Sequence, residues 1–226
     1  EIAQRYGVRI GDELLSTNNT TPCVSELFSY LKFVKERNCK VVVMEVSSES
    51  LLHNRLKPFR FTSCGFTNIT EDHLNVHKTI ENYRNCKFKL LDLLVDKNFV
   101  VVNGDDDNCK MIDRGNVYTF GFNSDNYCVI KNVKELSKNV QFDLWIKNKK
   151  YKLVSPFCGK YNIYNVTMAF LICMLRGVDT EYLIKKIRSL SIVSGRREYL
   201  DFGQNFDIIL DYAHTYNGIK CIFMKL

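Results

Sequence analysis

The chain has 226 residues and a net charge of +7, with 46% hydrophobic and 25% charged residues. These values are typical of a soluble globular protein of one or two domains. No run approaches the ~20 apolar residues of a membrane span, and no arginine-rich block or aromatic-flanked basic stripe indicates nucleic-acid binding. The basic balance allows an anionic ligand such as a nucleotide, although a generally basic protein explains it equally well.

Nine cysteines are spread along the chain, and none of them forms a C-x-x-C pair. This spacing favours neither a zinc ribbon nor a thioredoxin-type site. Cys64, Cys173 and Cys221 stand in apolar runs, where cysteine acts as a small hydrophobic side chain. With no signal peptide in the sequence, the pattern indicates a reducing, cytoplasmic environment. Residue 1 is Glu rather than Met, so we expect the natural start to lie upstream.

The first half of the chain alternates between helical and strand patterns. Val41–Met44 is continuously apolar, which predicts a strand buried on both faces of a parallel sheet. Glu45 then emerges at the carboxyl end of that strand, where ligands bind in open α/β sheets and where an acid is well placed to hold Mg²⁺ near a phosphate. The predicted elements are a helix at Val24–Arg37, strands at Lys40–Val46 and Phe61–Phe66, a helix at Thr79–Leu94 and a strand at Phe99–Val102.

The second half begins with a denser β-region, in which we expect antiparallel pairing. A long apolar helix closed by Gly177 follows, then a second helix that Asp179 or Thr180 can cap. We therefore expect one α/β domain: a mostly parallel sheet flanked by helices, with a small antiparallel subsheet. The elements are strands at Val117–Phe122, Tyr127–Val133, Gln141–Ile146 and Tyr151–Val154, helices at Asn162–Arg176 and Glu181–Leu190, and a strand at Phe206–Leu210 that ends at Asp211.

Lys87 lies on the apolar stripe of its predicted helix, seven residues after Ile80 and four after Tyr83. One interpretation is a side chain whose stem packs while its ammonium reaches solvent, and the pattern alone favours it. The other is a partly desolvated amine with a lowered pKa. A neutral amine can take up CO₂ to form a carbamate, which supplies oxygen ligands for Mg²⁺.

Several short sequence motifs, which follow one another in order along nearly the whole chain, resemble those of the Mur ligase family. These are the ATP-dependent enzymes that build the peptide of the bacterial cell wall. The nearest branch is the one that adds the third amino acid to UDP-N-acetylmuramoyl-L-alanyl-D-glutamate. No single motif is specific, but the motifs occur in the same order as in the family, which makes coincidence improbable. The motifs are Thr17–Pro22, Met44–Ser48, Asp72–His77, Tyr83–Lys87, Val102–Asp106, Gly159–Asn165, Gly195–Glu198 and Asp211–Thr215.

The resemblance implies roles for particular residues. Lys87, ten residues after His77, matches the carbamylated lysine of these ligases, and Glu45 and His77 match the residues that hold a magnesium ion with the carbamate. Residues matching those that bind the UDP-muramoyl-peptide are Asn19, Thr20, Thr21, Ser47, His53 and Arg55. Residues matching those that bind ATP are Asn165, Arg196, Asp211 and His214.

The residues also have simpler interpretations. Asn19 to Thr21 suit a turn before Pro22, and Asn162 suits a helix cap. The sequence also departs from the family motifs at four places. Glu49 stands where the family usually has His, and His53 stands where it often has Gln. Arg197 replaces the usual Met, and Tyr216-Asn217 replaces Pro-Asp. A carboxylate near an anionic ligand is unfavourable, so the first departure bears on substrate recognition.

No segment fits the P-loop motif G-x-x-x-x-G-K-[ST], which binds phosphate. The one Gly-Lys pair, Gly159-Lys160, is followed by Tyr161 where the motif needs Ser or Thr. The resemblance implies a central ATPase domain over residues 1–226, with the P-loop upstream and the amino-acid-binding domain beyond Leu226. It implies ATP and Mg²⁺ as cofactors, and a monomer that takes the UDP-muramoyl-dipeptide and L-lysine or meso-diaminopimelate. Alone, the chain is expected to be inactive. Two alternatives stay open: a related folylpolyglutamate or cyanophycin synthetase, and a degenerate paralogue that binds nucleotide-sugars without turnover.

Overall fold

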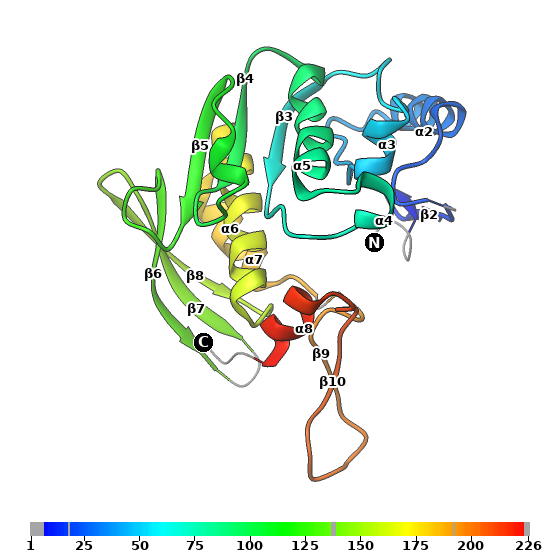
Figure 1. Ribbon diagram of the computed structural model, residues 1–226. Coiled ribbons are helices and arrows are strands. Elements are labelled where there is room, and N and C mark those ends of the chain that lie inside the picture. Colours follow the sequence, from blue (N-terminus) through cyan, green and yellow to red (C-terminus); the bar gives the residue numbers. More distant parts are fainter. Residues whose placement is uncertain (1–6, 18, 137–138, 192, 224–226) are drawn as a thin grey trace. The chain divides into compact units, whose positions relative to one another are not determined.

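The computed structural model describes residues 7–17, 19–136, 139–191 and 193–223. The chain divides into two compact units, one of residues 1–61 and 73–95 and one of residues 62–72 and 96–226. The first unit is mostly helical (Figure 1). Its elements are β1 (Val8–Ile10), β2 (Glu13–Leu15), α2 (Val24–Glu36), α3 (Ser48–Leu52), α4 (Leu74–His77), α5 (Ile80–Phe88) and the 3₁₀ helix η1 (Lys89–Leu93).

Helix α2 confirms the predicted helix at Val24–Arg37. A capping box begins it, in which the backbone N–H of Cys23 donates to the Glu26 carboxylate at 2.8 Å. Leu27 is 3% exposed and anchors the helix in the unit. Helix α5 also begins as predicted, since the Thr79 hydroxyl accepts the N–H of Asn82. It ends earlier than expected, because the backbone tightens into η1 before a strand begins at Leu94.

The predicted strand at Lys40–Val46 is wrong. These residues form no strand, and the side chains of Val41, Val42 and Val43 are 76%, 49% and 92% exposed. A buried parallel strand needs neighbours on both sides. The two short strands described in this unit, β1 and β2, pair with each other instead.

The second unit is built on a six-stranded sheet in the order β3-β4-β5-β6-β7-β8. Strand β4 pairs parallel with β5 and β5 with β6, whereas β6, β7 and β8 pair antiparallel. The α/β class is confirmed, but the expected antiparallel pairing of the first two strands in the β-region is wrong. The strands are β3 (Phe61–Phe66), β4 (Leu94–Asn103), β5 (Asn116–Gly121), β6 (Cys128–Glu135), β7 (Val140–Ile146) and β8 (Lys149–Ser155), with the 3₁₀ helix η2 (Cys109–Met111) after β4.

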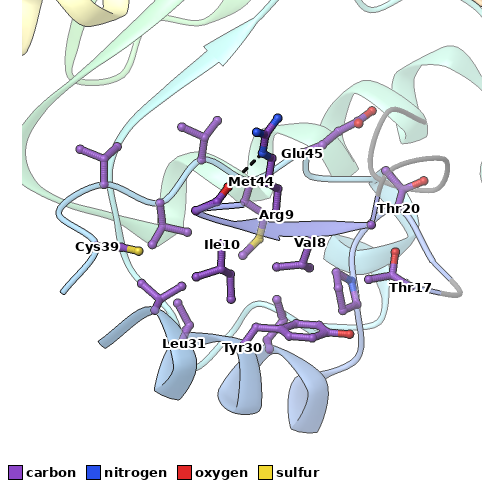
Figure 2. Close-up of a pocket in the computed structure, with 18 residues that line it drawn as sticks. Val8, Arg9, Ile10, Thr17, Thr20, Tyr30, Leu31, Cys39, Met44 and Glu45 are labelled. Carbon is purple, nitrogen blue, oxygen red and sulfur yellow. Dashed lines mark hydrogen bonds between the residues drawn. The ribbon is translucent and has the colours of Figure 1, made fainter. Parts of the chain in front are cut away.

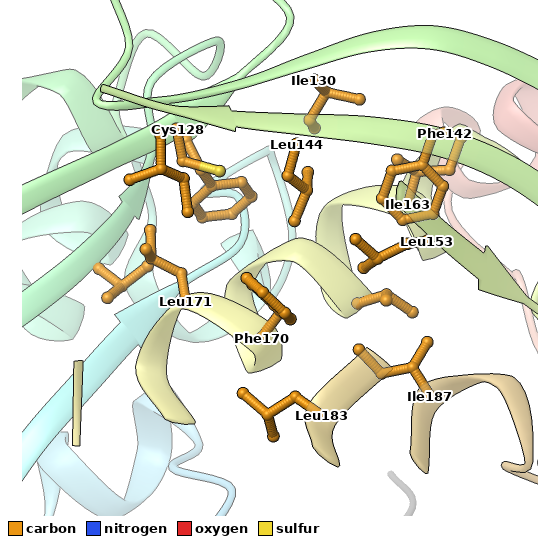
Figure 3. Packing of buried hydrophobic residues seen from close by; sticks show 14 of the residues in the cluster. Cys128, Ile130, Phe142, Leu144, Leu153, Ile163, Phe170, Leu171, Leu183 and Ile187 are labelled. Carbon is orange, nitrogen blue, oxygen red and sulfur yellow. The ribbon is translucent and has the colours of Figure 1, made fainter. Parts of the chain in front are cut away.

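Helices α6 (Lys160–Leu175) and α7 (Thr180–Arg188) cover one face of this sheet (Figure 1). Figure 3 shows the core between them, where Phe142 and Leu144 of the sheet face Phe170 of α6 and Leu183 of α7. The core is apolar and continuous, as expected of a sheet face covered by helices.

Both helices have local signals at their ends. Gly159 caps α6 with φ +95°, and Gly177, with φ +85°, follows its last turn as predicted. The proposed cap Asn162 is wrong: it lies inside α6 and donates to the backbone oxygen of Cys158. Asp179 caps α7 by accepting the N–H of Tyr182 at 2.8 Å.

The C-terminal part forms a hairpin and a last helix. Strand β9 (Glu198–Leu200) pairs antiparallel with β10 (Ile208–Leu210), and α8 (Tyr216–Phe223) follows. The strand predicted at Phe206–Leu210 is present, but in the structure it begins two residues later than predicted, at Ile208. Across the part of the chain that the structure describes, no helix combines the length and apolar composition needed to cross a bilayer.

Candidate active site

Thr21 links the two loops of the first unit that carry the proposed substrate residues. Its side chain is fully buried, donates to the backbone oxygen of Glu45 at 2.9 Å and accepts the N–H of Ser47 at 2.9 Å. Arg55 donates to the backbone oxygen of Thr21 at 3.3 Å. Thr21, Glu45, Ser47 and Arg55, from three separate segments, are thus brought together, and the Thr21 hydroxyl has a structural role.

A cavity of about 260 Å³ adjoins this cluster. Figure 2 shows Thr17 and Thr20 at one end of it, Cys39 at the other, and Val8 and Ile10 between them. Glu45 also contributes to the lining. The cavity therefore has an apolar body and a polar end, which is the usual make-up of a small-molecule pocket. Of the other proposed substrate residues, Asn19 is exposed, and His53 is exposed at the end of α3.

Ser47 and its neighbours hold α3 in place. The Ser47 hydroxyl caps the helix by accepting the N–H of Ser50 at 3.2 Å. Ser48 is buried; its hydroxyl lies 3.0 Å from Nε2 of His77, and its backbone oxygen accepts from the Cys86 thiol. Helices α3, α4 and α5 are therefore joined at Ser48.

His77 and Lys87 meet around one aromatic ring. The His77 ring centroid lies 5.2 Å from that of Tyr83, and Nζ of Lys87 lies 4.9 Å from the same Tyr83 centroid. Tyr83 is 6% exposed, so the Lys87 Nζ lies over the face of a buried ring. The pairing of His77 with Lys87 fits the proposed site. Whether the Glu45 carboxylate converges with them stays a prediction.

Electrostatics around His77 involve a residue that the sequence patterns did not assign to the site. Burial lowers the pKa of His77 below its ordinary value, and the charges of His73 and Lys87 lower it further. The Glu49 carboxylate opposes this shift. The sequence marks Ser48, Glu49 and Tyr83 as parts of family motifs or departures from them, but not as neighbours of His77. Ser48 and Glu49 approach His77 only through the packing of α3 against α4.

The described side chains do not form a ready Mg²⁺ site. Among them, no three His, Cys, Asp or Glu residues gather closely enough to hold a metal ion. Mg²⁺ prefers oxygen ligands, and Nε2 of His77 already contacts Ser48. A Mg²⁺ ion bound here would therefore need further oxygen ligands, which a carbamate on Lys87 would add.

In the second unit, Asp211 forms the centre of the proposed nucleotide site. Its Oδ2 accepts the Tyr161 hydroxyl at 3.0 Å and the N–H of Arg197 at 2.8 Å, and its Oδ1 accepts the N–H of Ala213 at 2.8 Å. A carboxylate offers about four acceptor positions, so a ligand hydroxyl can still be accommodated. Asn165 is exposed one turn after Tyr161 on the same face of α6, and Tyr161 is the residue of that helix that donates to Asp211.

Arg196 and His214 flank Tyr212. The Arg196 guanidinium carbon lies 5.3 Å from the Tyr212 ring centroid, and the His214 ring centroid lies 5.2 Å from it on an edge. Nδ1 of His214 also lies 3.1 Å from the Tyr212 backbone oxygen. Asp211, Arg196 and His214 thus gather at the end of β10, whereas a site shared with Asn165 on α6 stays a prediction.

Asp105, just beyond β4, forms a second part-buried carboxylate network in this unit. It accepts N–H groups of Phe122 and Asn123, the Asn126 amide and the Tyr164 hydroxyl, at 2.6 to 3.2 Å. Burial raises the pKa of Asp105, but these donors lower it more, so it lies below its usual value. The network joins α6 to the carboxyl end of the sheet.

Comparison with known proteins defines the class. A family model described as the Mur ligase middle domain matches residues 3–173. The chain is 32% identical, over 221 residues, to the UDP-N-acetylmuramoyl-L-alanyl-D-glutamate--L-lysine ligases of Staphylococcus haemolyticus and of Staphylococcus aureus strain MW2. Each match covers 95% of this chain and 45% of the relative, so the chain spans less than half the length of these curated relatives.

Solved structures agree in fold. A UDP-N-acetylmuramoyl-L-alanyl-D-glutamate--2,6-diaminopimelate ligase superposes with a TM-score of 0.76 at 22% identity, covering 92% of this chain and 44% of that one. The MurF ligase of Thermotoga maritima in complex with ADP gives a TM-score of 0.64 at 18% identity, covering 74% and 39%. The fold is thus that of a domain found in peptide-forming ligases. With the family match over residues 3–173 and the 32% identity, the chain belongs to the Mur ligase family.

Proposed function

We propose that this chain provides the substrate-binding and nucleotide-binding core of an ADP-forming ligase that adds the third amino acid to UDP-N-acetylmuramoyl-L-alanyl-D-glutamate. The observation that carries the proposal is the 32% identity to L-lysine ligases across 95% of the chain. The added residue is L-lysine or meso-diaminopimelate. The product belongs to the peptidoglycan precursors, and the enzyme acts in the cytoplasm as a monomer.

The chain's residues take the following roles. Arg55, held beside Thr21, binds an anionic group of the muramoyl substrate, because a guanidinium forms paired hydrogen bonds with carboxylate or phosphate oxygens. Asn165 and Asp211 bind the adenosine part of ATP, with Asp211 accepting from a ribose hydroxyl. Arg196 supplies positive charge beside them. ATP activates the D-glutamate carboxylate as an acyl phosphate, which the amino group of the third residue attacks with loss of phosphate.

Lys87 is proposed to carry a carbamate. Lys87 is half-buried and its Nζ lies over the ring of the buried Tyr83, so its amine is partly withdrawn from water. A carbamate there, with His77 and Glu45, would hold Mg²⁺, which supplies charge stabilisation for phosphoryl transfer. This role rests on the family resemblance and on the proximity of Lys87 to His77.

Substrate binding tests the proposal directly. Titration calorimetry of the chain with UDP-N-acetylmuramoyl-L-alanyl-D-glutamate is expected to show binding that Arg55→Ala weakens by roughly tenfold, the scale of one charge-assisted contact. Arg60→Ala is the matched control, because in the described part of the chain the Arg60 guanidinium donates to nearby backbone oxygens, those of Lys57 and Phe59. Absence of binding by the unaltered chain, or equal losses in both variants, would contradict the proposed substrate site.

A further inference from the structure

The Asp211 carboxylate is held by a neighbour whose side chain plays no part in the function proposed above. One of its two Oδ2 donors is the backbone N–H of Arg197. Arg197 has φ +48°, a left-handed conformation that is uncommon for a residue other than glycine and costs free energy unless its surroundings fix it. The position of this N–H therefore depends on what anchors Arg197.

The anchor is an ion pair within the second unit. Nη2 of Arg197 lies 3.2 Å from Oε1 of Glu135 at the end of β6, and the two side chains are only 12% and 22% exposed. A part-buried, well-paired guanidinium resists displacement, because losing its partner leaves a desolvated charge. The Arg197 Nε is buried with no hydrogen-bond partner among the described residues. Burial lowers the pKa of Arg197, and the charge of Glu135, followed by a hydrogen bond with Tyr199, raises it by more, so Glu135 is the main electrostatic compensation.

The same guanidinium packs at the start of α6. A Cβ built on Gly159 would lie 2.6 Å from Nη1 of Arg197, so only glycine leaves room for it there. Tyr161, two residues further on, donates the second hydrogen bond to Oδ2 of Asp211. Arg197 thus connects β6, the first turn of α6 and the Asp211 carboxylate, and fixes their relative positions.

We propose that Arg197, held by Glu135, is a positioning residue that orients the Asp211 carboxylate for a ribose diol. This inference rests on the proposed nucleotide-binding function and adds its specificity determinant. When the ion pair is lost, the strained backbone at Arg197 relaxes, its N–H leaves Oδ2, and the carboxylate rotates about its side-chain bonds. Recognition of the ribose hydroxyls then falls, whereas contacts to the base persist.

The test compares adenosine with 2′,3′-dideoxyadenosine. Neither compound has phosphates, so the lack of a P-loop word in the sequence does not affect the comparison. NMR titration of the chain is expected to show adenosine binding at least fivefold more tightly, the scale of one hydrogen bond to a carboxylate. Arg197→Met and the isosteric Glu135→Gln should each reduce this ratio to near one, and Arg197→Lys, which keeps the charge, should restore part of it.

Lys150→Met is the matched control. It removes the ion pair with Asp143 at 2.8 Å, in the same sheet but without contact to the Asp211 network, and should leave the ratio unchanged. If the unaltered chain discriminates and both Arg197→Met and Glu135→Gln retain that discrimination while folded, the positioning role is overturned and the nucleotide site stands. If the unaltered chain binds neither compound, or binds both equally, the ribose role of Asp211 itself fails and the inference falls with it.

Discussion

At the scale of single residues, Asp105 shows how closely the carboxyl end of the sheet is specified. Four donors from the loop after β5 and from α6 surround its carboxylate. The position facing it must be glycine, because a Cβ on Gly121 would overlap Oδ1 of Asp105. The glycine thus leaves room for an ionised carboxylate. Such a group is costly to bury unless its oxygens accept hydrogen bonds.

Asp105→Asn is expected to destabilise the chain by about 2 kcal/mol at pH 7, because hydrogen bonds to a charged group are lost. The folded pKa of Asp105 lies below the unfolded value of about 3.9. Its ionised form therefore stabilises the chain above about pH 4, and this contribution disappears as the pH falls through the folded pKa. Urea unfolding at pH 7 and near pH 3 should show the difference between the two proteins shrinking.

Asp107→Asn is the control for this prediction, because the Asp107 side chain is 98% exposed. It should change the free energy of unfolding by less than about 0.5 kcal/mol at either pH. An Asp105→Asn effect that is absent at pH 7, or that stays constant with pH, would show that the network does not depend on the charge.

The sequence identifies some site residues better than their neighbours. Lys87 can be recognised because an ionisable group on an apolar helical stripe is unusual. His77 can be recognised because it belongs to a motif that resembles the family's. Ser48 and Glu49 approach His77 from a helix 28 or more positions away, as the Ser48–His77 contact shows. A periodic pattern carries no information on such tertiary neighbours, so only coordinates could reveal them.

At the scale of elements, local signals were reliable and pairing signals were not. Helices α2, α6 and α7 lie close to their predicted bounds, because caps and apolar spacing are properties of neighbouring residues. Strand direction is set by distant partners, and so the parallel pairing of β5 with β6 was not predicted. The strand prediction for residues 40–46 is wrong for the same reason. Apolar side chains indicate a tendency to be buried, but they do not indicate which segment would pack against them.

The exposed segment at 40–46 leads to a prediction about stability. Val43→Lys is expected to change the free energy of unfolding by less than about 0.5 kcal/mol, because the Val43 side chain is already 92% exposed. Leu144→Ala, at a fully buried position of β7, should cost about 2–5 kcal/mol. Denaturant titration of both variants makes the comparison. A loss from Val43→Lys as large as that from Leu144→Ala would mean that this segment is packed in solution.

At the scale of the whole molecule, the proposed chemistry divides between the two units. The residues proposed for the muramoyl substrate, together with Lys87 and His77, belong to the first unit, and those proposed for ATP belong to the second. Each unit holds its set through its own hydrogen bonds, through Thr21 in one case and Asp211 in the other. Transfer of a phosphoryl group to the substrate would require both sets, because neither binds both reactants.

The 226-residue chain alone is predicted to catalyse little or no ligation. Phosphoryl transfer depends on positioned cations and amides around the β- and γ-phosphates, and no segment of its sequence fits the P-loop word that supplies them. A phosphate-release assay with ATP, Mg²⁺, UDP-N-acetylmuramoyl-L-alanyl-D-glutamate and L-lysine should therefore stay at background, while the Staphylococcus aureus relative is active in parallel. Turnover that needs both acceptor and amino acid, and that Lys87→Ala abolishes, would show that the chain supplies its own phosphate-binding groups.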